Sequence, residues 1–247
     1  PERREKAKIP DEVVFQTKPQ QAAAMLKHAW QQGVPMRWVA GDEVYGDAPE
    51  LRDTIAQHGK LYVLGVRSNQ PVWTKRPEVI EPQARKRGRP RTKARLAEDA
   101  PPATTVAAVV SAWPEHRWQR LTVAEGEKGL VTYDWACQRI VESSHGLPGR
   151  DAWLIARRSR NDGHEIAYYL SNAPLETSLR QMAQVASRRY TVEQCIEEAK
   201  GETGLDEYEV RLWHSWHRHI TLSMMAHTWL AAMRYQANQE KGALNRS

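Results

Sequence analysis

Cysteine is scarce in this sequence, and long apolar runs are missing altogether. The 247 residues contain only Cys137 and Cys195, which is too few for a disulfide framework and fits a reducing compartment. No stretch of about 18 apolar residues exists, so we expect no membrane-spanning helix. The opening segment PERREKAKIP has no apolar signal core. We therefore expect a cytoplasmic protein.

Several common catalytic patterns are missing too. The chain has no nucleophile-elbow serine, no phosphate-binding loop and no dinucleotide-binding glycine pattern. The sequence also begins without methionine, and its first 20 residues read like an interior loop and strand that lead into a helix. We expect an N-terminally truncated fragment.

Positive charge is in excess. Lys and Arg number 36 against 30 Asp and Glu, giving 36 − 30 = +6 and a pI near 9.4. Such a balance favours an acidic partner, with nucleic acid first and an anionic membrane surface second. Seven cations lie within RKRGRPRTKAR, which includes Arg87, Arg89 and Arg91. Two interpretations stay open: a GRP segment that enters the DNA minor groove, as an AT-hook does, or a flexible linker that touches phosphates.

Helix and strand signals alternate in the first quarter of the chain. Thr17 is a candidate N-cap for a helix that Gly33 ends, and MRWVAGD then reads as a strand ending at Asp42. APELRDTIAQHG is a second helix and KLYVLGV a second strand. This alternation predicts an α/β core with a parallel sheet.

The alternation stops at Arg67. Residues 68–102 read as a Pro- and Arg-rich loop or disordered link, and DAWLIARRS with EIAYYLSNA as a hairpin. Trp213 to Tyr235 is apolar on nearly all sides, which predicts a helix inside the core. We expect a first core segment at 1–66, an inserted and partly β segment at 67–173, and a helical segment at 174–247.

Seven carboxylates crowd residues 188–211. On a helix over 182–203, an apolar stripe of Val185, Val192, Ile196 and Ala199 should face the core. Arg189, Glu193 and Lys200 fall together beside this stripe, whereas Glu198 and Glu202 point toward solvent and Glu197 stays undecided. Glu193 is then either a site carboxylate or half of an ordinary i,i+4 ion pair with Arg189.

Asp42 is the second candidate acid. It follows an apolar strand, and ligands of α/β proteins bind at the carboxyl ends of parallel strands. The alternative is that Asp42 only caps the next helix. Trp73, Trp113 and Trp118 either stack on bases or pack in a small β core.

Two further groups of residues have simple explanations. His214, His217 and His219 lie close together in the chain, but helical spacing separates His219 from the other two, which disfavours zinc. Cys195 is expected to be a packing residue.

Two stretches, VAGDEVYGDAPELRDTI and RRYTVEQCIEEAKGETGLDEYEVRLWHSWHRHITLSMMAH, resemble bacterial insertion-sequence transposases of the DDE type. These are also called DDE superfamily endonucleases, and the similarity is to the group of the IS-four supergroup numbered seven hundred and one. The signature of the supergroup, Y-x-x-R-x-x-x-E-x-x-x-x-x-x-K, falls on Arg189, Glu193 and Lys200, with Ala186 at the tyrosine position. The family's second catalytic aspartate falls on Asp42.

The resemblance covers nearly the whole chain and implies an RNase-H-like core with the inserted segment before the catalytic helix. It also implies a first catalytic aspartate on an earlier strand, which we assign to no residue of this chain. Asp42 and Glu193 would ligate two Mg²⁺ ions, or Mn²⁺, for DNA strand cleavage and transfer. Arg189 and Lys200 would hold phosphates.

Two functional hypotheses follow from this resemblance. The first is a transposase catalytic region, acting as a homodimer on paired DNA ends and inactive alone because one aspartate is absent. The alternative is a non-catalytic basic DNA-binding remnant of a transposase, or a domesticated derivative.

Overall fold

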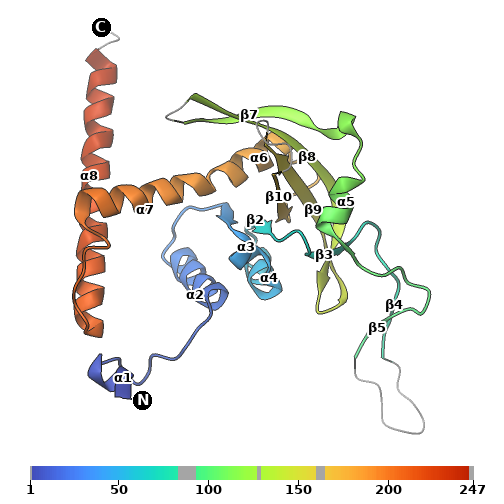
Figure 1. Cartoon of the computed structure of the whole chain (residues 1–247), viewed down its shortest axis with the longest axis horizontal. Coiled ribbons are helices and arrows are strands. Elements are labelled where there is room, and N and C mark those ends of the chain that lie inside the picture. The colour runs from blue at the N-terminus through green and yellow to red at the C-terminus, as the bar shows by residue number, and fades with distance from the viewer. Residues whose placement is uncertain (1, 83–92, 127–128, 160–164, 245–247) are drawn as a thin grey trace. The chain divides into compact units, whose positions relative to one another are not determined.

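A computed structural model of the chain describes residues 2–82, 93–126, 129–159 and 165–244 (Figure 1). The chain divides into two compact units, which are residues 16–189 and the combination of 1–15 with 190–247. Each unit is described by itself. Among the described residues, no helix combines the length and apolar character needed to cross a bilayer.

The larger unit is built on one mixed sheet. Its strands follow the order β1-β2-β10-β9-β8-β3-β6, and β7 pairs with β8 outside that path. The strands are β1 (Trp38–Gly41), β2 (Leu61–Val66), β3 (Pro71–Trp73), β6 (Thr104–Thr105), β7 (Gln119–Gly126), β8 (Gly129–Ser144), β9 (Leu147–Arg158) and β10 (Ile166–Ser171). Two short strands, β4 (Val79–Ile80) and β5 (Arg95–Leu96), pair separately. The predicted α/β class is confirmed.

The first quarter of the chain forms the expected elements. Helix α2 (Lys18–Gln31) begins at a capping box in which the Thr17 hydroxyl accepts the Gln20 N–H, and Gly33 follows its end with φ +73°. The strands β1 and β2 pair in parallel, with α3 (Glu43–Gly46) and α4 (Pro49–Gln57) between them in the chain. Among the described strands, β1 pairs only with β2 and so lies at one end of the sheet.

The middle of the chain is more ordered than its composition predicts. The β9–β10 hairpin is confirmed, with Leu154 opposite Leu170. The prediction that residues 68–102 form only a loop or disordered link is wrong for β3, which pairs with β8 and β6. Trp73 in β3 is buried, and apolar burial fixes this strand in spite of the prolines around it.

Apolar side chains cover both faces of the sheet, because successive residues of a strand point to opposite sides. On one face, Tyr62 and Leu64 of β2 pack with α2, α4 and α5 (Val106–Ser111). On the other face, Val63 packs with Trp135 and with α6 (Leu179–Ser187), whose Met182, Ala183 and Ala186 are all buried. A short 3-10 turn (Glu115–Arg117) leads into β7.

The smaller unit consists of α1 (Glu2–Lys6), α7 (Arg189–Thr203), which begins at the last residue of the larger unit, and α8 (Trp213–Leu244). The Trp213 N–H donates to the carbonyl of Ala7 at 2.8 Å, and Arg234 of α8 ion-pairs with Glu202 of α7 at 2.6 Å. The first contact joins the two ends of the chain, and the second joins α8 to α7.

Helix α8 is not the core helix that its composition predicts. Among the residues of α8 whose burial is described, the buried ones are the polar Ser223 and His227, whereas Leu222, Met225 and Trp229 are each more than half exposed. His227 is buried because it faces polar partners on α7. Its Nε2 lies 3.5 Å from Cys195 Sγ, and its Nδ1 lies 4.0 Å from Glu202 Oε2. His219 contacts the Gly204 carbonyl at 2.9 Å, and the His217 ring packs on Trp213 at 4.3 Å.

Candidate active site

Asp42 is the residue that follows β1, at the strand end where α/β proteins bind ligands. It is also the N-cap of α3: its Oδ1 accepts the Val44 N–H at 3.0 Å, and its carbonyl accepts the N–H of Gly46 at 2.9 Å. The cap occupies one carboxylate oxygen. The half-buried side chain therefore has a fixed direction.

Glycines let α3 lie directly on β2. A Cβ atom on Gly46 would stand 1.8 Å from the carbonyl oxygen of Gly65. A Cβ on Gly65 would stand 3.3 Å from the backbone of Asp42, and one on Gly41 would stand 3.1 Å from the Leu64 side chain. The Gly-Asp-x-x-x-Gly pattern thus holds Asp42 against the sheet by close backbone contact.

A buried polar cluster of Arg52, Glu142 and Tyr62 contacts the end of α3. Arg52 of α4 is fully buried; its Nη1 donates to the carbonyl of Gly46, and its Nε ion-pairs with Glu142 Oε2 at 2.9 Å. Glu142 on β8 also accepts the hydroxyl of Tyr62. Burial first, and then the charge of Glu142, raises the pKa of Tyr62 well above its usual value, so Tyr62 remains the donor.

This cluster is not predictable from the sequence. The available signal was an arginine beside Leu51 and Ile55 on the apolar side of α4. Its partner Glu142 lies 90 residues away in a segment of ambiguous pattern, so the pair itself was not predictable.

Asp47 has a different partner. Its Oδ2 lies 3.1 Å from Arg67 Nε, and its Oδ1 accepts the Arg67 N–H at 3.2 Å. Asp47 therefore ties the end of α3 to the end of β2. The neighbouring Glu43 is exposed.

The second candidate acid lies in α7. Arg189 and Glu193 are both exposed, and Lys200 Nζ lies 3.6 Å from Asp206 Oδ2. The predicted continuous helix over 182–203 is wrong, because α6 ends at Ser187 with Arg188 as its C-cap and α7 starts at Arg189.

The apolar stripe beside Glu193 also differs from its prediction. Val192 and Ile196 are about half exposed, and only Ala199 of α7 is buried. Glu198 and Glu202 are not free solvent-facing acids, since Arg234 of α8 ion-pairs with both. Cys195, expected to be a packing residue, is exposed with its Sγ near His227.

Ala186, at the tyrosine position of the signature, is buried in α6 against the sheet. Asp42 and Glu193 belong to different compact units. Within the described residues, no three His, Cys, Asp or Glu side chains gather as ligands of one metal ion. The metal assignment of Asp42 and Glu193 stays a prediction, and Arg87, Arg89 and Arg91 lie outside the described residues.

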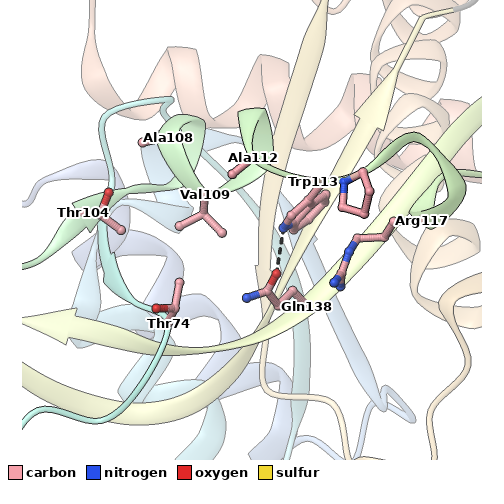
Figure 2. Close-up of a pocket in the computed structure, with 9 residues that line it drawn as sticks. Thr74, Thr104, Ala108, Val109, Ala112, Trp113, Arg117 and Gln138 are labelled. Carbon is pink, nitrogen blue, oxygen red and sulfur yellow. Dashed lines mark hydrogen bonds between the residues drawn. The ribbon is translucent and has the colours of Figure 1, made fainter.

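The tryptophans of the middle segment serve the core. Trp73 and Trp113 are buried, and the Arg158 guanidinium lies 4.6 Å from the Trp118 ring. Trp113 lines a pocket of about 310 Å³, and its indole N–H donates to Gln138 Oε1 at 2.8 Å (Figure 2). Arg117 lies over the same indole at 5.5 Å.

A family model described as "DDE superfamily endonuclease" matches residues 1–130, which is more than half of the chain. The matched part includes Asp42, the glycines around α3 and Arg52, and it ends before α7. No curated protein matches the chain.

Proposed function

Because the chain belongs to the DDE superfamily endonucleases, we propose that it is a transposase catalytic region that cleaves DNA strands and transfers them at insertion-sequence ends. The mixed α/β sheet is consistent with the RNase-H-like fold of such enzymes. The observation that supports the proposal most is the position of Asp42, at the end of a parallel strand with its carboxylate held by α3.

Carboxylate oxygens are the hard ligands that Mg²⁺ prefers, and Mn²⁺ accepts the same set. Asp42 and Glu193 would hold the ions, which, when bound, activate the attacking hydroxyl and stabilise the leaving oxygen. The Val44 N–H fixes the direction of one ligand before any ion binds. A two-metal site also needs a bridging carboxylate, which we assign to no residue here, so we expect this chain alone to cleave little or no DNA.

Cationic residues would bind the DNA. Arg189 and Lys200 would contact phosphates near the cleaved bond, and Arg87, Arg89 and Arg91 would contact the backbone further away. We further propose that the enzyme acts as a homodimer on paired ends in the bacterial cytoplasm, at the nucleoid.

Cleavage of labelled insertion-sequence ends by the protein expressed from the complete reading frame tests this function. We expect Asp42→Asn and Glu193→Gln each to remove cleavage in Mg²⁺ or Mn²⁺, while DNA affinity changes by less than about threefold because the phosphate contacts remain. Two exposed neighbouring acids provide matched controls, Glu43→Gln and Glu197→Gln, which should cleave normally. Undiminished cleavage by either Asp42→Asn or Glu193→Gln would refute the assignment.

A further inference from the structure

The direction of the Asp42 carboxylate depends on a helix that cannot be stable by itself. Helix α3 has four residues, and helices shorter than about 12 residues are marginal in water. The N–H groups of Val44, Tyr45 and Gly46 all bond to Asp42, through its side chain or its carbonyl. Contacts from elsewhere in the fold must therefore keep this turn closed.

One such contact comes from Arg52. Its guanidinium is fully buried and donates to the carbonyl of Gly46, the last residue of α3. The same guanidinium is tied to β8 through Glu142, and Tyr62 of β2 binds the other oxygen of that carboxylate. The end of α3 is thus linked through one guanidinium to two strands of the sheet.

We propose that Arg52 is a positioning residue for Asp42, holding α3 closed so that the capped carboxylate keeps the direction needed to bind a metal ion. The role in metal binding rests on the function proposed above, whereas the anchoring of α3 does not.

The chemistry of arginine suits this role. Its planar guanidinium presents several donors in a fixed arrangement, so it can serve a carbonyl and a carboxylate at once. Lysine at this position would keep a cation beside Glu142 but would lose the fixed second donor to Gly46. Stability alone does not require the pair, since buried ion pairs are often replaceable by apolar side chains at little cost.

A variant that removes the whole polar cluster separates positioning from stability. Arg52→Met, Glu142→Met and Tyr62→Phe together leave no unpaired buried charge. They also remove Arg52 Nη2, which is buried without a hydrogen-bond partner among the described residues. We expect the thermal midpoint of this triple variant to lie no more than about 5 °C below that of the parent chain.

The first readout is amide hydrogen exchange of the chain, followed by mass spectrometry. Exchange in residues 44–47 should rise at least about tenfold in the triple variant, while β9 and β10 stay protected. The control is Arg150→Met, which removes an ion pair of 2.6 Å between β9 and Asp53 of the same helix α4 without touching α3. This control should leave exchange in residues 44–47 unchanged.

The second readout is cleavage by the protein from the complete reading frame. We expect the triple variant to need about tenfold more Mg²⁺ for half-maximal cleavage, with partial rescue by Mn²⁺, a change that lost stability alone would not produce. If the triple variant fails to fold, Arg52→Lys is tested in the same way, with the same expected direction.

Unchanged exchange in residues 44–47 would overturn the anchoring, and raised exchange with an unchanged Mg²⁺ requirement would overturn the positioning of a metal ligand. If Asp42→Asn itself cleaves normally, the proposed function fails, and the exchange result still decides whether Arg52 holds α3.

Discussion

At the scale of single residues, the surroundings of each side chain decide what its chemistry can do. The two cysteines differ in this way. Cys137 lies in β8 within the sheet, where burial raises the pKa of its thiol to about 11, whereas Cys195 on α7 is exposed. Since the thiolate is the reactive form, the two thiols should react at very different rates.

We predict that iodoacetamide at pH 8 labels Cys195 and spares Cys137. At that pH about one Cys137 thiol in a thousand is ionised, and access is restricted as well. Intact and peptide mass spectrometry over time measures both sites. Labelling of Cys137 should appear only after urea unfolding, and equal labelling of both in the native chain would contradict the described burial of β8.

The charged residues between 188 and 211 show which side-chain neighbours can be predicted from the sequence. Helical spacing could group Arg189, Glu193 and Lys200, because that depends only on local geometry. It could not reveal that Arg234 pairs with Glu198 and Glu202, since this partner lies on another helix and more than 30 residues away. Local patterns therefore indicate which acids are neighbours, but not which of them already have a cation.

At the scale of elements, the contact of α3 with β2 is the feature that holds the candidate site. Gly46 and Gly65 meet there, and a Cβ on Gly46 would stand 1.8 Å from the Gly65 carbonyl oxygen. That distance cannot be relieved by a side-chain rotation, because the obstructing atom is backbone. The requirement for glycine was invisible in the sequence, since it arises from two segments that meet only in the fold.

We predict that Gly46→Ala destabilises the chain by about 3 kcal/mol or more, because α3 must move off the sheet. Gly201→Ala is the matched control: it lies inside α7 with nothing within 4 Å of the added carbon, and it should stabilise its helix by about 0.5–1 kcal/mol. Urea unfolding followed by circular dichroism measures both. A Gly46→Ala chain as stable as the parent would contradict the close packing of α3.

Elements with strong local signals were predictable. The N-cap at Thr17, the parallel pair β1–β2 and the β9–β10 hairpin all follow from short patterns and are confirmed. The helix over residues 213–235 was predictable too, but its burial was not, because apolar composition on all sides predicts burial only if other elements surround the helix. Among the residues of α8 whose burial is described, Ser223 and His227 are the buried ones.

At the scale of the whole molecule, residues 67–173 contribute strands to the main sheet. Strands β8, β9 and β10 continue the sheet that starts with β1 and β2, and Glu142 of β8 reaches the cluster under Asp42. The middle of the chain therefore supports the candidate site directly. Sequence alone could not show this, because strand pairing between β2 and β10 joins residues about 100 apart.

The proposed function depends most on Asp42 and Glu193, of which Asp42 would ligate one ion of the metal pair and Glu193 the other. Substituting Fe²⁺ for Mg²⁺ in the DNA-bound protein from the complete reading frame, with ascorbate and peroxide, cuts the polypeptide beside the bound ion. The account predicts cuts near both residue 42 and residue 193, both lost in Asp42→Asn and both kept in Glu43→Gln. Cuts near only one of these residues, or cuts that persist in Asp42→Asn, would contradict it.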